Sequence, residues 1–305
     1  MKNKTRIFTV LMFSILLFNC ESKQKQKTIE TTNLETEKVP YNVVKTNNAK
    51  SLLILFPGGG STSKETKQVF KITKPATENG ISILFMDFNR HLWLENEDCM
   101  QLTNQIENAI KKHHLNIDNV FIGGISIGGN VSLTLTNYLL KTKHKINPKG
   151  VFVVDSPIDL YALYKSSMKD VAQKGFSEER LAEPKGIIAY FESRFGGKDS
   201  LLTNIQKVSP YTFKTKNRYN IHQIQNIKSR IYIEPDTLWY KEVRQTDFES
   251  TNAYALQRMY QNLKENNWTN IELITTKNKG FRLNGKRNPH SWSIVSVEEL
   301  IQWIK

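Results

Sequence analysis

The stretch that decides the fold is FIGGISIGG, residues 121–129, in which Ser126 stands between Gly124 and Gly128. The residues before it are aromatic or β-branched, as in a buried strand, and apolar residues then recur at helical spacing at Ile127, Val131, Leu135 and Leu139. Nearly side-chain-free residues two positions before and after the serine let a strand reverse sharply into a helix. We therefore expect Ser126 to be presented on a tight turn with strained backbone angles.

Short apolar runs recur along the chain with helical segments between them. They span residues 52–56, 81–86, 120–122, 151–154, 231–233 and 271–274. Their apolar character is continuous and not alternating, which indicates strands buried on both faces of a sheet. Alternating strands and helices predict an α/β fold with a mostly parallel, doubly wound sheet.

The connection between the fourth and fifth of these runs is far longer than a simple crossover. It covers about residues 156–229 and contains amphipathic stretches at 160–171, 178–195 and 201–208. We expect a helical insertion that overhangs the carboxyl ends of the strands as a cap or lid, because ligands bind at that edge of open α/β sheets.

The N-terminal segment differs in composition from the rest of the chain. Basic residues and an apolar run in residues 1–19 predict a secretory signal, and LFNC at 17–20 resembles a bacterial lipobox that would lipidate Cys20. An ordinary signal peptide or an uncleaved anchor is the alternative. Residues 20–40 are polar and predict a flexible tether, so residues 41–305 form the expected single domain. Either alternative predicts an exported domain, and a lipidated Cys20 would hold it at the membrane of the bacterial cell envelope.

The formal net charge of +14 over 305 residues is basic, but no Lys/Arg run with interleaved aromatic residues indicates a nucleic-acid surface. No Cys/His cluster has metal-ligand spacing, and the glycines match neither a P-loop nor the dinucleotide fingerprint. We therefore expect no nucleic acid, metal or cofactor.

Cys99 is predicted to be a small buried apolar residue on a helix.

A serine nucleophile requires a base, and the base requires an acid that orients it. His290 follows the last predicted strand and precedes a helix that begins near Ser296, so its loop can reach back to Ser126. The acid should follow a strand that lies between these two residues. Asp236 fits best, just past the run at 231–233; Asp155, after the run at 151–154, is the main alternative and Glu234 a lesser one.

Backbone N–H groups that stabilise a developing oxyanion have two candidate sources. One is the amide of Ile127, directly after Ser126. The other is the glycine-rich segment that follows the first strong strand, in which Gly59 and Gly60 are the expected donors.

Taken in order, Gly58-Gly59-Gly60, Gly124-Ile125-Ser126-Ile127-Gly128, Asp236 and His290 resemble the motifs of the α/β-hydrolase superfamily. The similarity covers about residues 43–305. The run Val208-Ser209-Pro210-Tyr211 is similar to the segment before the acid-bearing strand in dienelactone-hydrolase-like and prolyl-oligopeptidase-like members. The resemblance implies that Ser126 attacks a carbonyl, that His290 acts as base and then as acid, and that Asp236 fixes the imidazole tautomer.

These features predict an exported serine hydrolase that cleaves a carboxylic ester through an acyl-serine intermediate. The expected substrate is a small-molecule, glycan-linked or lipid ester. A peptidase or an acyltransferase would use the same three residues, and a non-catalytic binding lipoprotein could retain the fold. The walls of the pocket decide among these functions.

Overall fold

The computed structural model describes residues 41–88 and 91–305. The predicted signal at 1–19, the tether at 20–40 and Cys20 lie outside the described residues and stay predictions. No helix in the described ranges has the length and apolar character needed to cross a membrane.

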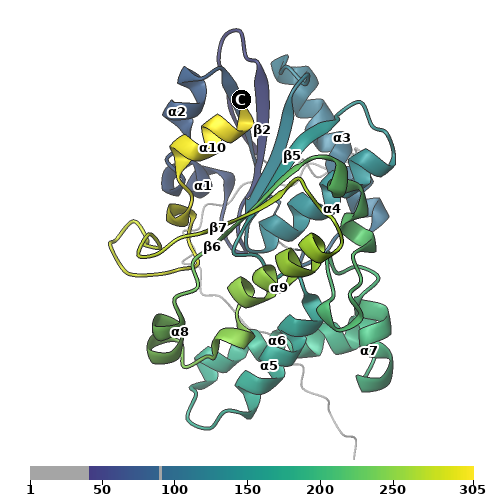
Figure 1. Cartoon of the computed structure of the whole chain (residues 1–305), viewed down its shortest axis with the longest axis vertical. Coiled ribbons are helices and arrows are strands. Elements are labelled where there is room, and N and C mark those ends of the chain that lie inside the picture. The colour runs from purple at the N-terminus through teal and green to yellow at the C-terminus, as the bar shows by residue number, and fades with distance from the viewer. Residues whose placement is uncertain (1–40, 89–90) are drawn as a thin grey trace, which may run out of the picture. The chain divides into compact units, whose positions relative to one another are not determined.

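The centre of the fold is a seven-stranded sheet with the strand order β1-β3-β2-β4-β5-β6-β7 (Figure 1). Its strands are β1 Tyr41–Val44, β2 Ser51–Phe56, β3 Ile81–Met86, β4 Val120–Ile125, β5 Pro148–Val154, β6 Lys228–Ile233 and β7 Ile271–Thr275. All pairs are parallel except β1 with β3. The predicted α/β class and mostly parallel sheet are confirmed. The edge strand β1 was not predicted, because it is only four residues long and half-buried.

Helices cover both faces of the sheet, as the continuous apolar strands require. Leu53 and Leu55 of β2 pack on the face covered by α1, α2 and α10, whereas Leu52 and Ile54 pack on the face covered by α3 and α4. The bounds are α1 Ser63–Val69, α2 Thr73–Glu78, α3 Asn96–His113, α4 Ile127–Lys141, α9 Asn252–Glu265 and α10 Val297–Ile304. Helix α9 packs on β5 and β6, on the same face as α4. Two complete apolar layers therefore fix the positions of the strand ends.

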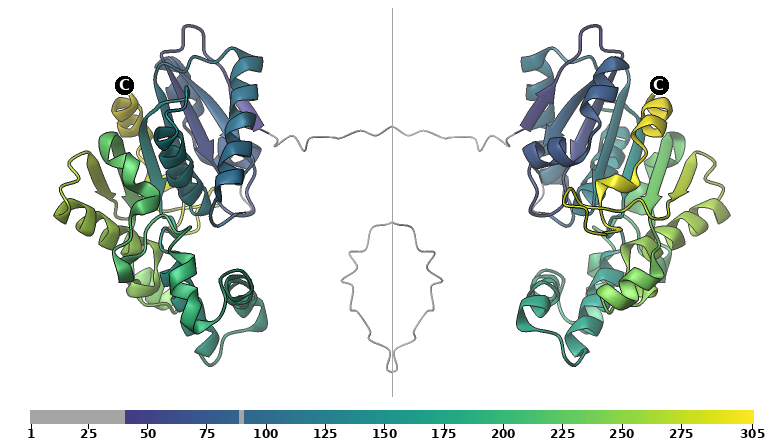
Figure 2. Two further views of the ribbon diagram at one scale, coloured as in Figure 1. Left: turned by 90° about the vertical axis from the view of Figure 1, so that its right-hand side faces the viewer. Right: turned by 90° about the vertical axis from the view of Figure 1, so that its left-hand side faces the viewer.

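The segment between β5 and β6 contains three α-helices: α5 Leu160–Ala172, α6 Glu178–Phe195 and α7 Lys198–Ile205. Figure 2 shows α5 and α6, in teal, beyond one end of the sheet. They enclose a small aromatic core of their own, in which Trp93 lies against Tyr190, Phe191 and Phe195. Trp93 is only 5% exposed, so it packs the insertion and does not line an open pocket.

Shorter helices complete the described chain. They are α8 Thr237–Val243 and the 3₁₀ helices η1 Phe213–Thr215, η2 Tyr219–Asn226, η3 Phe248–Ser250 and η4 Trp292–Ile294. Helix α8 follows β6 directly, and Asp236 caps its N-terminus by accepting a hydrogen bond from the Trp239 amide. This placement brings α8 to the carboxyl end of the sheet.

Cys99 lies on α3 and is buried, as its apolar neighbours in the sequence predict. Burial, together with the negative charge of Asp98, raises the pKa of its thiol to about 12. Since the thiolate is the reactive form of cysteine, Cys99 is an inert core residue.

Candidate active site

Ser126 occupies the turn between β4 and α4 with φ 56° and ψ −129°, on the positive-φ side that non-glycine residues rarely adopt. Its amide donates to the carbonyl of Val154 on the neighbouring strand (2.9 Å), and its carbonyl accepts from the Gly129 amide (2.9 Å). These bonds hold the strained turn from both sides. The expected sharp turn at Ser126 is therefore present.

The glycines around Ser126 are needed for close backbone approach. A Cβ on Gly124 would overlap the backbone of Gly128, and a Cβ on Gly128 would overlap the carbonyls of Phe56 and Pro57. The strand, the turn and the loop after β2 thus meet at one point where side chains have no room. This contact places the glycine-rich loop beside Ser126.

The loop after β2 forms a tight turn in which the Ser61 amide donates to the carbonyl of Gly58 (3.1 Å), with Gly60 at φ 75°. Gly58 faces the Cβ of Ser126, and Gly59 faces the side chain of Ile127. Gly60 faces open space, with no atom within 4 Å of an added Cβ. An added Cβ would therefore meet the turn at Gly58 and Gly59 but not at Gly60. The oxyanion roles of Gly59, Gly60 and Ile127 stay predictions.

Asp155, and not Asp236, is the partner of His290. Nδ1 of His290 lies 2.6 Å from Oδ2 of Asp155, which is 2% exposed. The prediction that Asp236 orients His290 is therefore wrong. The physical reason is strand order: Ile125 pairs with Val154, so Asp155 leaves the sheet directly beside Ser126, whereas β6 lies one strand farther away.

Asp155 is held firmly in this place. Its backbone is at φ 39°, its amide donates to the carbonyl of Tyr232 (3.0 Å), and its carbonyl accepts from Asn252 (3.1 Å). Its Oδ1 is buried and has no hydrogen-bond partner. Burial, followed by the charge of Asp155, raises the pKa of Tyr240, so this phenol stays neutral. The fixed carboxylate can orient the imidazole through Nδ1, which leaves Nε2 as the ring nitrogen that can take a proton.

Within the described chain, no hydrogen bond of 3.5 Å or less joins the Ser126 hydroxyl to His290. Such contacts are often long in unliganded sites and tighten when substrate binds.

The two other acidic candidates hold the loop that carries His290. This histidine loop comprises residues 276–291. Arg287 donates to Asp236 (2.6 Å) and forms an ion pair with Glu234, whose side chain is almost fully buried. Glu234 also accepts hydrogen bonds from the loop at Thr276 (2.7 Å) and at the Lys279 amide (2.9 Å). Neither Glu234 nor Asp236 bonds to the imidazole, so Glu234 is also wrong as the orienting acid.

Arg287 was not singled out from the sequence. It stands among other basic residues in a polar loop, and nothing in its neighbours separates it from the exposed Arg282.

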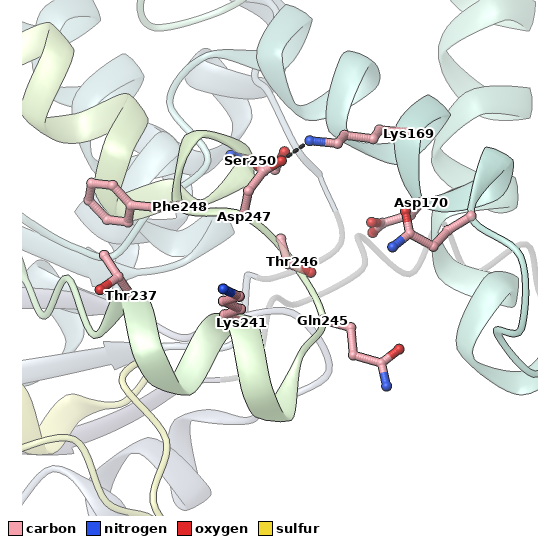
Figure 3. A pocket seen from close by; sticks show the side chains of 10 residues that line it. Lys169, Asp170, Thr237, Lys241, Gln245, Thr246, Asp247, Phe248 and Ser250 are labelled. Carbon is pink, nitrogen blue, oxygen red and sulfur yellow. Dashed lines mark hydrogen bonds and ion pairs between the residues drawn. The ribbon is translucent and has the colours of Figure 1, made fainter.

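An open cleft of about 580 Å³ lies between the end of α5 and the segment from α8 to η3 (Figure 3). Lys169 and Asp247 form an ion pair across it. Most of its lining side chains carry amides, hydroxyls or charges, and Phe248 is the large apolar member: Lys169, Asp170, Gln173, Thr237, Lys241, Gln245, Thr246, Asp247, Phe248 and Ser250. The residues of the Ser126 turn do not line this cleft.

No protein-family model and no curated protein matches the sequence. Similar solved structures include esterase B from Lactobacillus rhamnosis, with 12% identity, TM-score 0.55 and coverage of 89% of this chain and 83% of that one. An esterase of the bacterial hormone-sensitive lipase family has 15% identity, TM-score 0.50 and coverage of 88% and 83%. An S-formylglutathione hydrolase from Agrobacterium tumefaciens has 11% identity, TM-score 0.52 and coverage of 88% and 91%. The chain therefore has the α/β-hydrolase fold.

Proposed function

We propose that the protein is a serine hydrolase that cleaves carboxylic esters through an acyl-serine intermediate. The observation that carries the proposal is the Asp155–His290 pair at 2.6 Å, built beside a serine with φ 56°. A structural serine would have no need for a strained turn or for a buried carboxylate behind a histidine at the same sheet edge.

In the proposed reaction, Nε2 of His290 takes the proton of Ser126 as Oγ attacks the ester carbonyl. Asp155 accepts from Nδ1, which fixes the tautomer and stabilises the imidazolium. The backbone amides of Ile127 and Gly59 are the expected donors to the oxyanion. His290 then protonates the leaving alcohol, and water attacks the acyl-serine by the same route.

We further propose a hydroxylated substrate, such as an acylated sugar, over a long-chain lipid ester. Support comes from the cleft between α5 and α8, because most of its lining side chains carry amides, hydroxyls or charges that can form hydrogen bonds with sugar hydroxyls. Helix α8 contributes Thr237 and Lys241 to the cleft, and its N-cap residue Asp236 accepts a hydrogen bond from Arg287 of the histidine loop.

Fluorophosphonate labelling of the chain tests the function. We expect the wild type to label and the His290→Ala variant to label at least about 100-fold more slowly, because the base is lost. An ester panel should favour acetylated sugars over long-chain esters. Cleavage of matched amides at comparable rates would point instead to a peptidase, and transfer to an added alcohol to an acyltransferase. A folded wild type that never labels would contradict the proposal and favour a binding protein.

We also propose that the chain is exported and anchored in the cell envelope through a lipid on Cys20. The support is the sequence LFNC at 17–20 and the polar tether after it. Cells that express the protein and are fed labelled palmitate should yield a labelled band that partitions with membranes. The Cys20→Ser variant should lose both label and membrane partitioning, and an unchanged distribution would contradict the lipid anchor.

A further inference from the structure

Glu234 is a buried carboxylate that holds the histidine loop but takes no part in the proposed reaction. Glu234 follows β6 and is 2% exposed, yet it carries a charge. A buried carboxylate is strongly unfavourable unless hydrogen bonds and a counter-charge compensate for its lost hydration. Among the described residues, all hydrogen-bond and ion-pair partners of its side chain belong to the histidine loop.

These partners enclose the carboxylate. Thr276 and the amides of Lys279 and Gly280 donate to it, and Arg287 forms an ion pair with it. Burial opposes the ionisation of Glu234, but these four groups outweigh it and hold the pKa of the carboxyl below its ordinary value of 4.5. Glu234 is thus a fixed anion to which both ends of the loop are attached.

Arg287 connects this anion to the segment that carries the histidine. One side of its guanidinium reaches Glu234 and Asp236, and the other donates to the carbonyl of Gly280 (2.6 Å). The Asn288 amide donates to the same carbonyl (2.9 Å), and Asn288 accepts from the amide of His290 (3.2 Å). A continuous chain of polar contacts therefore leads from Glu234 to the backbone of His290.

We propose that the carboxylate–arginine cluster of Glu234, Asp236 and Arg287 positions His290 for proton transfer. The inference rests on the proposed function, and the members of the cluster are positioning residues. Arg287 suits this role because its planar fork can bind two carboxylates and a carbonyl at once, which the ammonium of a lysine cannot reproduce. Without the guanidinium of Arg287, Glu234 still holds the loop through Thr276 and the amides of Lys279 and Gly280. The segment that bears His290 is then no longer held by Arg287.

The test uses Arg287→Met in the whole chain, with Arg282→Met as the matched control. Both arginines lie in the histidine loop, and the side chain of Arg282 is exposed. We expect Arg287→Met to lower kcat for an ester about 10- to 100-fold, since displacement of a catalytic group by about 1 Å has this effect. KM should change by less than about 2-fold, and Arg287→Lys should restore only part of the loss. Arg282→Met should match the wild type.

Active-site titration with the fluorophosphonate separates positioning from folding. If the cluster positions His290, every Arg287→Met molecule still labels at the end-point, but each labels more slowly. If it only stabilises the fold, the labelled fraction falls, kcat per labelled site stays at the wild-type value, and the inference is overturned. A wild type that fails to label would instead refute the proposed function, so the two failures are distinguishable.

Glu234→Gln provides a second, independent test. The two variants act on one contact, so we expect the double variant Glu234→Gln/Arg287→Met to be no slower than the slower single variant. The pKa of Glu234 is lower in the folded protein than its ordinary value of 4.5. The stabilisation that its ionised form provides is therefore complete above about pH 4.5 and is lost only as the pH falls through the lower pKa of the folded state. The loss in kcat should therefore be constant from about pH 6 to 9. Additive losses, or a loss that changes across this range, would contradict a shared positioning role.

Discussion

We expect Asp155→Asn to lower kcat for the proposed ester reaction by roughly 10⁴-fold, the size of effect that follows when a triad carboxylate is made neutral. Asparagine retains the volume of aspartate, but its amide can present an N–H to Nδ1 of His290. The imidazole then holds its proton on the wrong nitrogen and cannot accept one from Ser126. The measurement is steady-state hydrolysis of an acetyl ester, with folding checked by circular dichroism.

Asp236→Asn is the matched control for this prediction. Its Oδ atoms contact Arg287 and the Trp239 amide, not the imidazole. An asparagine oxygen can still accept from either group, and Glu234 continues to hold Arg287, so we expect a loss of less than about tenfold. If Asp236→Asn were the more damaging of the two variants, His290 would be oriented by Asp236 during catalysis and the pairing at 2.6 Å would have no catalytic role.

Helices and turns that depend on a local sequence pattern could be predicted well. The turn at Ser126, helix α4 after it and the insertion helices α5, α6 and α7 all follow from local periodicity and from glycines without room for a side chain. Each of these features is decided within about twenty residues. The edge strand β1 is the exception, because its four half-buried residues carry almost no pattern.

The acid could not be predicted, because it depends on which strands are neighbours. Asp155 and Asp236 both follow buried strands and both precede His290, so local sequence patterns do not decide which of them contacts the histidine. The sheet separates them: β5 lies next to β4, and β6 lies beyond β5. The register of β4 with β5 then sets Asp155 beside Ser126 and leaves Asp236 beside Arg287. Strand order and register arise from packing over the whole domain and not from any local motif.

Ser126→Gly is expected to lower kcat on the order of 10⁶-fold and, at the same time, to stabilise the protein by about 1 kcal/mol. The backbone angles of Ser126, φ 56° and ψ −129°, are close to the mirror image of extended backbone, which glycine adopts as readily as its opposite hand. A strained residue of this kind costs about 1 to 3 kcal/mol, and the greater freedom of glycine in the unfolded chain offsets part of the gain.

Ser126→Ala separates the two effects, because alanine lacks the hydroxyl but keeps the Cβ that causes the strain. It should lose activity as completely as Ser126→Gly and yet unfold at the wild-type urea concentration, whereas Ser126→Gly should unfold at a higher one. Equal midpoints for all three proteins would mean that the turn is not strained. A turn that strains Ser126 lowers the stability of the fold, and a serine with only a structural role gives no reason to keep such a turn. A higher stability of Ser126→Gly would therefore support a catalytic role for Ser126, as a loss of activity would.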